Sequence, residues 1–90
     1  MNLDPGKLLA FSPLHRLQWE EAQQKHVILY PEGMVELNLP SAEILQLCDG
    51  AHNADTIVEA LEQKFNETGL KDDIYGFLEI ALGNGWIRTL

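Results

Sequence analysis

The sequence predicts an α+β fold, a winged-helix-like domain in which a three-stranded antiparallel sheet is followed by three helices. Before residue 40, apolar residues alternate with polar ones or form short β-branched runs, a pattern that is typical of strands. After residue 40, apolar residues recur at intervals of three and four, which is typical of helices. Turn residues at Pro31-Glu32-Gly33, Asp49-Gly50 and Asn84-Gly85 separate the segments. The change of period therefore places a sheet first and a helical half second.

Length, composition and charge exclude several classes of protein. Ninety residues make one small domain, and an apolar fraction of 46% suits a globular chain. With 14 acidic and 6 basic residues the net charge is −8, whereas a nucleic-acid-binding protein needs a basic stripe to displace phosphate counterions. The same charge disfavours anionic membrane surfaces, and no apolar run reaches the ~18 residues of a membrane span. We therefore predict a cytoplasmic protein that binds neither nucleic acid nor membrane.

The N-terminal segment and the first strand are predicted from composition and alternation. Residues 1–13 contain Pro and Gly and lack a clear period, so we expect a flexible N-terminal arm, or one strand that docks late. Residues 14–90 then form a single peptide-binding domain. Within it, residues 14–20 alternate with Leu17 and Trp19 on the inner face, which predicts a half-buried strand.

The central strand is predicted at residues 26–30, because the run HVILY is typical of a strand that is buried on both faces. After the turn at residues 31–33, residues 34–39 alternate again, and the side chains expected to point inward are Val35, Leu37 and Leu39. We expect this third strand to complete an antiparallel meander.

Two helices are predicted between residues 40 and 66 from their caps and apolar spacing. Asn38 or Ser41 is the expected N-cap of the first helix, and Asp49-Gly50 its end. Its inner face consists of Ser41, Ile44, Leu45 and Cys48. Asn53 is the expected cap of the second helix, whose inner face consists of Ala54, Ile57, Val58, Leu61 and Phe65.

The third helix is predicted to start at Asp72 or Asp73, either of which is a suitable N-cap, and to stop at Asn84-Gly85. Its expected buried face consists of Ile74, Phe77, Leu78, Ala81 and Leu82. We expect Trp86 and Ile87 to fold back onto the core, and Trp19 to close the side of the core.

A three-stranded meander predicts a binding edge. If the first strand pairs with the second, residues 34–38 carry a free row of N–H and C=O groups, and an extended peptide can add there as a fourth strand. The apolar stripe of the third helix is wider than a small core requires, so we expect this helix to form the wall of a groove beside the edge. The expected peptide-binding residues are Met34, Val35, Glu36, Leu37, Asn38, Asp73, Ile74, Tyr75, Phe77, Leu78 and Ala81.

The charge around this expected groove predicts the chemistry of its ligand. The acidic residues near it are Glu36, Asp72, Asp73 and Glu79. Because opposite charges favour each other across an interface, these residues favour a peptide that carries Lys or Arg.

The reactive side chains predict no catalytic or metal site. His15, His26 and His52 have no ligand spacing with Cys48 or with a carboxylate, and we interpret Cys48 as a buried core thiol. The spacing suggests no nucleophile beside a base. We therefore expect a protein that is not an enzyme and that uses no cofactor.

Several motifs at fixed separations point to a family. The most specific are HVILYPEG at residues 26–33, Leu37-Asn38, and LCDG at residues 47–50. Further matches are Arg16-Leu17, Ser41-Ala42, Ile44-Leu45, Ile57, Leu61, Asp73, Phe77-Leu78 and Gly85-Trp86-Ile87. Over residues 14–88 the chain resembles the coenzyme PQQ synthesis protein D family, the PqqD-type peptide chaperones. It departs at His52-Asn53, where the family usually has a basic residue and a threonine, although Asn caps a helix as well as Thr.

The resemblance implies a non-catalytic peptide chaperone in the biosynthesis of pyrroloquinoline quinone (PQQ), similar to the leader-binding domains called RiPP recognition elements. It implies that the protein captures the ribosomal precursor peptide PqqA. It also implies delivery of PqqA to the radical S-adenosylmethionine (SAM) enzyme PqqE, which joins a Glu and a Tyr of the peptide.

A winged-helix regulator that binds DNA is the alternative from another class. Such a regulator requires a basic recognition helix. The helix predicted at residues 53–66 has one basic residue, Lys64, and three acidic residues, Asp55, Glu59 and Glu62, which disfavours this alternative. For the oligomeric state we expect a monomer, and the hinges near residues 31–33 and 39–40 leave an element-swapped dimer as the other option.

Overall fold

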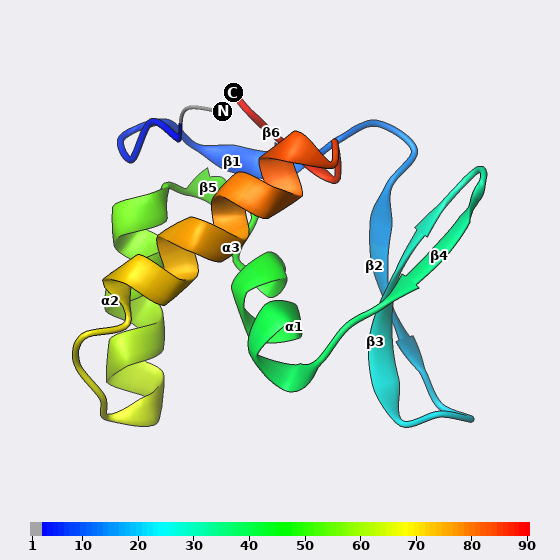
Figure 1. Ribbon diagram of the computed structural model, residues 1–90, viewed down its shortest axis with the longest axis horizontal. Coiled ribbons are helices and arrows are strands. Elements are labelled where there is room, and N and C mark those ends of the chain that lie inside the picture. Colours follow the sequence, from blue (N-terminus) through cyan, green and yellow to red (C-terminus); the bar gives the residue numbers. More distant parts are fainter. Residues whose placement is uncertain (1–2) are drawn as a thin grey trace.

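A computed structural model describes residues 3–90 and places two three-stranded antiparallel sheets around three helices (Figure 1). The predicted α+β class is confirmed, although the sequence indicated one sheet rather than two. The elements are β1 (Leu9–Phe11), β2 (Arg16–Glu20), β3 (Lys25–Tyr30), β4 (Gly33–Glu36), α1 (Leu39–Gln46), β5 (Asp49–His52), α2 (Ala54–Phe65), α3 (Lys71–Gly83) and β6 (Ile87–Thr89).

The first sheet is the predicted meander, with the strand order β2-β3-β4. Val27 and Ile28 of the central strand β3 are both fully buried, and successive strand side chains point to opposite faces. The expectation of a central strand buried on both faces is therefore confirmed. The prediction that Trp19 closes the core is wrong, because its side chain is 45% exposed and its indole N–H donates to Glu21. Trp19 lies edge-on to His26, outside the core cluster.

The second sheet has the order β5-β1-β6 and corrects two expectations. Of the two alternatives for residues 1–13, the docked strand is the one observed and the flexible arm is wrong for this part: β1 forms the middle of this sheet, and Leu9 is fully buried. Residues 1 and 2 of that segment lie outside the described residues. Asp49-Gly50 does follow α1, but it also opens β5, where Gly50 has a φ of +86° that suits glycine.

The caps of the first two helices follow the sequence. The side chain of Asn38 accepts a hydrogen bond from the backbone N–H of Ser41 at the start of α1. Asn53 and Thr56 bond each other reciprocally at the start of α2, which forms a capping box. Leu39 and Phe65 were wrongly assigned to inner faces, since they are 67% and 44% exposed at the two helix ends.

Replacing Asn53 by Ala is expected to lower the free energy of unfolding by about 0.5–2 kcal/mol, because the first turn of α2 loses the acceptor for the Thr56 N–H. Urea denaturation followed by circular dichroism measures this change. Asn53→Ser keeps an N-cap acceptor and serves as the control, with a smaller expected loss. Equal losses in the two variants contradict the assigned cap.

The third helix begins differently from the prediction. Neither Asp72 nor Asp73 caps it: among the described residues, no side chain caps α3 at its N-cap residue Leu70, whose own N–H donates to Glu62 Oε2 at 3.0 Å. The two carboxylates lie in the first turn instead, where the helix dipole favours negative charge. The predicted end is close to the observed one, since α3 ends at Gly83.

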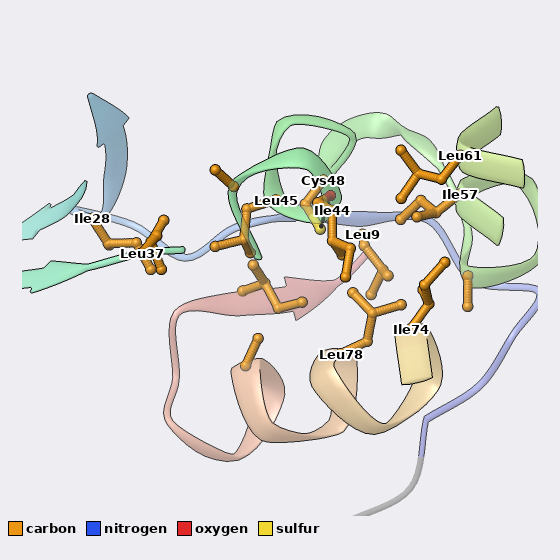
Figure 2. Close-up of a cluster of buried hydrophobic side chains, with 14 residues drawn as sticks. Leu9, Ile28, Leu37, Ile44, Leu45, Cys48, Ile57, Leu61, Ile74 and Leu78 are labelled. Atoms are coloured by element: carbon orange, nitrogen blue, oxygen red, sulfur yellow. Dashed lines mark hydrogen bonds between the residues drawn. The ribbon is translucent and has the colours of Figure 1, made fainter. Parts of the chain in front are cut away.

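The core lies between the three helices and the second sheet, and it extends to β3 of the first sheet. Figure 2 shows Ile74 and Leu78 of α3 pointing toward Leu9 and Ile44, with Ile28 at the far end of the same cluster. Behind the turn that follows α3, Trp86 is half-buried and Ile87 is buried, so the expected return of this segment to the core is confirmed.

Candidate functional site

One edge of the first sheet has a free row of backbone groups. Among the strands of residues 3–90, β4 is hydrogen-bonded to β3 alone. The N–H of Leu37 donates to the C=O of His26 at 3.0 Å, and Val35 lies opposite Ile28. Since bonded pairs alternate along an antiparallel ladder, the N–H and C=O groups of Met34 and Glu36 point away from β3. These groups are available to a further strand.

The side chains of β4 divide between the edge and the core. Met34 is 46% exposed, and Glu36 forms an ion pair across the sheet with Lys25 at 3.3 Å. Val35 is half-buried and Leu37 is buried. Of the expected binding residues here, Met34 and Glu36 of β4 therefore face solvent. Val35 and Leu37, which directly follows β4, point toward the core.

The described part of the N-terminal segment, residues 3–13, does not pair with this edge. β1 bonds to β5 and β6 in the other sheet, and in the view of Figure 1 α1 lies between α2 and the first sheet. Within the described part of the chain, no strand seals β4. The edge predicted from the meander is therefore open.

A groove of about 460 Å³ opens next to the point where β4 leads into α1. It lies between the start of α1, the end of α2 and the first half of α3. Its apolar lining consists of Leu39, Pro40, Ile44, Leu61, Phe65, Leu70, Ile74 and Phe77. Its polar lining consists of Asn38, Ser41, Glu43, Glu67 and Asp73.

The groove shares only part of its lining with the expected binding residues. Asn38, Asp73, Ile74 and Phe77 line it, so α3 does form one wall. Met34, Val35, Glu36 and Leu37 do not line it, so the groove lies between the helices, whereas the sequence had predicted a groove between α3 and the strand. The end of α2 was not expected to contribute. The residue that could have indicated this contribution is Phe65, the last apolar residue of the α2 stripe. The spacing of apolar residues alone placed Phe65 in the core.

Three residues expected at the site lie elsewhere. Leu78 and Ala81 are fully buried in the core, and the hydroxyl of Tyr75 donates to Asp55 on α2, which raises the pKa of Tyr75 to about 12. The ammonium group of Lys71 also lies 5.3 Å from the centre of the Tyr75 ring. Leu78 and Ala81 lie on the inner face of α3, which packs into the core that the second sheet shares, whereas Tyr75 faces α2.

The opposite edge of the first sheet is also open. β2 pairs with β3 alone in the described residues, and the alternation of bonds points the backbone groups of Leu17 and Trp19 outward. A shallow pocket beside this edge includes Phe11, Leu45 and Gln46. The β2 edge is therefore the natural comparison for any binding at β4.

Two kinds of reactive site, a metal centre and an accessible thiol, can be checked in the described residues. No group of three metal-ligating side chains comes together there, and none of the described helices has the length and hydropathy that crossing a bilayer requires. Cys48 is buried, and its Sγ lies 3.7 Å from the carbonyl oxygen of Ile44. The expectation of a core thiol is confirmed.

Cys48 is expected to react with a thiol-specific disulfide reagent at pH 8 at least ~100-fold more slowly in the native protein than in urea. Burial, with a smaller contribution from the charge of Asp49, raises the pKa of the Cys48 thiol to about 12, so the reactive thiolate is scarce. The absorbance of the released reagent follows the reaction. Fast labelling of the folded protein contradicts the buried placement.

The family model for coenzyme PQQ synthesis protein D (PqqD) matches residues 25–87, which is more than two thirds of the chain. The chain belongs to the PqqD family. The resemblance found in the sequence is confirmed, and the match covers β3 and β4 of the meander together with α1, α2 and α3.

Similar proteins are named PqqA binding protein. The one from Methylococcus capsulatus (strain ATCC 33009 / NCIMB 11132 / Bath) is 58% identical over 90 residues, which is 100% of this chain and 97% of that protein. The one from Klebsiella pneumoniae is 48% identical over 81 residues, or 89% of this chain and 88% of the other. The one from Pseudomonas aeruginosa (strain UCBPP-PA14) is 51% identical over 74 residues, or 81% and 80% of the two chains.

Two solved structures share the fold. The PqqD truncation of Methylobacterium extorquens PqqCD, described as a functional and stand-alone RiPP recognition element, superposes with a TM-score of 0.80 at 22% identity and covers 97% of this chain and 95% of that one. The heterocyclase TruD superposes with a TM-score of 0.71 at 20% identity over 93% of this chain, which is 12% of TruD. The same fold is thus found as a free domain and as a small part of a larger enzyme.

Proposed function

We propose that this protein is a non-catalytic peptide chaperone of PQQ biosynthesis, which acts as a monomer in the cytoplasm. In this proposal it binds PqqA by strand addition at β4 and presents the peptide to the radical SAM enzyme PqqE. The single observation that carries the proposal is the open β4 edge, with the outward backbone groups of Met34 and Glu36, in a member of the PqqD family. The names of the similar proteins support PqqA as the ligand.

Strand addition alone supplies only part of a useful affinity. The N–H and C=O groups of Met34 and Glu36 can make up to four backbone hydrogen bonds, at roughly 0.5–1.5 kcal/mol each. That total of about 2–6 kcal/mol falls short of the ~8 kcal/mol that corresponds to a micromolar dissociation constant. Side-chain contacts must supply the difference, and the apolar groove that begins at Asn38 is the surface that lies nearest along the chain.

The same geometry suits presentation of a peptide. A peptide that adds to β4 uses one row of its backbone groups, and its other row becomes the new edge of the sheet. That row and the outer side chains stay accessible to an enzyme. A chaperone of this kind therefore orders an extended peptide without enclosing it.

The DNA-binding alternative lacks support on the second helix. The ammonium group of Lys64, the single basic residue of α2, forms an ion pair with Glu43 at 2.6 Å. Because this charge is already neutralised within the protein, α2 offers no basic face to a phosphate backbone.

Calorimetric titration with synthetic PqqA tests the proposed binding. We expect a saturable heat with one peptide per protein, and no heat with a peptide of the same composition in scrambled order. Absence of binding to PqqA at tens of micromolar contradicts the proposal.

A second assay tests presentation. PqqE is incubated with PqqA with and without this protein, and modified PqqA is quantified by mass spectrometry. We expect more product in the presence of the protein. An unchanged yield at saturating chaperone contradicts the presentation step while leaving peptide binding intact.

A further inference from the structure

The groove between α1, α2 and α3 is large enough, and apolar enough in its lining, to admit a large apolar side chain. Its volume of about 460 Å³ lies within the roughly 300–1,000 Å³ range of pockets that hold small organic ligands. Leu39 is 67% exposed and Phe65 is 44% exposed, although both are large apolar residues at the groove. A ligand group that covers them removes apolar surface from water, which favours binding.

The rim of the groove carries uncompensated negative charge. Glu43 is paired with Lys64 at 2.6 Å, but no Lys, Arg or His among residues 3–90 forms an ion pair with Glu67 or Asp73. These two carboxylates stand beside an otherwise apolar lining. A cationic group that binds next to an apolar group in the groove is therefore attracted by these two carboxylates.

The groove begins two residues after the end of β4 along the chain. Asn38 is the N-cap of α1, it follows β4 by two residues, and it also lines the groove. Because a strand advances by roughly 3.3 Å per residue, a peptide that lies along Met34 and Glu36 reaches the groove within a few residues. One peptide can therefore occupy the edge and the groove together.

We infer that the groove is a second anchor site, which takes a large apolar side chain of the bound peptide together with an adjacent Lys or Arg. The inference rests on the proposed function, since the peptide is the one that adds to β4. The apolar side chain enters between Leu39, Phe65 and Phe77, and the cation lies at Glu67 and Asp73. Selection for the apolar and basic pair then comes from the groove, whereas the strand segment contributes affinity with little preference for side chains.

A matched pair of charge reversals tests the cationic half of this inference. Asp73→Lys and Asp72→Lys both change a carboxylate in the first turn of α3, so the cost to the helix dipole is similar. Asp73 lines the groove and Asp72 does not. We expect Asp73→Lys to weaken PqqA binding about 3- to 10-fold and Asp72→Lys to change it less than 2-fold. Thermal melts of both variants verify that they remain folded.

A second pair tests the apolar half. Leu39→Ser and Leu14→Ser both replace a leucine that is largely exposed, at 67% and 78%, so neither should unfold the protein. Leu39 lines the groove and Leu14 does not. We expect a roughly 5- to 10-fold loss of affinity for Leu39→Ser alone.

Peptide variants identify the group that enters the groove. Each Lys or Arg of synthetic PqqA is replaced by Gln, and each large apolar residue by Ala. One basic variant should lose affinity for the native protein and bind Asp73→Lys without further loss, since the two changes remove the same contact. If, for every basic residue of the peptide, the loss of affinity from its replacement by Gln simply adds to the loss from Asp73→Lys, the inference is contradicted.

Methyl NMR of the native full-length chain separates this inference from the proposed function. With PqqA added, we expect shifts at Ile44, Leu61 and Ile74, which are core side chains that also line the groove, and little change at Ile87, a core side chain that does not line it. Shifts confined to the β4 amides, with equal affinities for Asp73→Lys and Asp72→Lys, overturn the second anchor and leave strand addition standing. Absence of any PqqA binding overturns both.

Discussion

Replacing Leu9 by Ala is expected to lower the free energy of unfolding by about 2–5 kcal/mol. Leu9 is fully buried, and it belongs to the middle strand of the sheet β5-β1-β6. Its loss leaves a cavity between that sheet and the helices, where Ile44 and Leu78 now contact it (Figure 2). For a 90-residue domain this is a large share of the total stability, which is typically about 5–15 kcal/mol.

Urea denaturation followed by tryptophan fluorescence measures the effect on stability. Leu8→Ala provides the control, because Leu8 directly precedes β1 and its side chain is 40% exposed. Its replacement should lower the free energy of unfolding by less than about 1 kcal/mol. If Leu9→Ala and Leu8→Ala are equally mild, the N-terminal segment is not part of the core.

Replacing Glu36 by Pro is expected to weaken PqqA binding by about 2–4 kcal/mol, or roughly 30- to 1,000-fold. The N–H of Glu36 points away from β3, so Pro removes a donor from the free edge and none from the β3–β4 ladder. The peptide then loses one backbone bond, and its own carbonyl is left without a partner. Proline is tolerated on an edge strand when the lost N–H faces solvent, so the fold should persist.

Glu36→Ala is the matched control for this experiment. It removes the same carboxylate and the same ion pair with Lys25, but it keeps the backbone N–H. Calorimetry with synthetic PqqA should show a small change for Glu36→Ala and a large one for Glu36→Pro. Similar affinities for both variants place the peptide somewhere other than the β4 edge.

Local patterns in the sequence were sufficient for the meander and for two of the helices. The run at residues 26–30 has the β-branched density of a doubly buried strand, and Asn38 and Asn53 are caps whose effect depends only on the next few residues. These features are determined within one turn or one strand. They are predictable because they need no knowledge of distant contacts.

The second sheet could not be read from local patterns. Its strands have three or four residues each and come from both ends and the middle of the chain. Asp49-Gly50 has the composition of a turn, and only pairing with β1 makes it a strand. Non-local pairing of this kind leaves too short a pattern in the sequence to show a period.

The candidate site was predictable in part for the same reason. The open edge follows from the order of three consecutive strands, so the sequence indicates Met34 and Glu36 correctly as exposed positions. Leu78 and Ala81 were misassigned because the second sheet, which needs cover, was not visible. The contribution of Phe65 depends on how α2 and α3 pack together, which the spacing of apolar residues does not specify.

Amide hydrogen exchange at β4, with and without PqqA, tests strand addition most directly. The N–H groups of Met34 and Glu36 face solvent in the free protein and should exchange quickly, and PqqA should slow both strongly. The outward N–H groups of Leu17 and Trp19 on β2 should be unaffected by the peptide. Protection of Leu17 and Trp19, with Met34 and Glu36 unchanged, would contradict binding at the β4 edge.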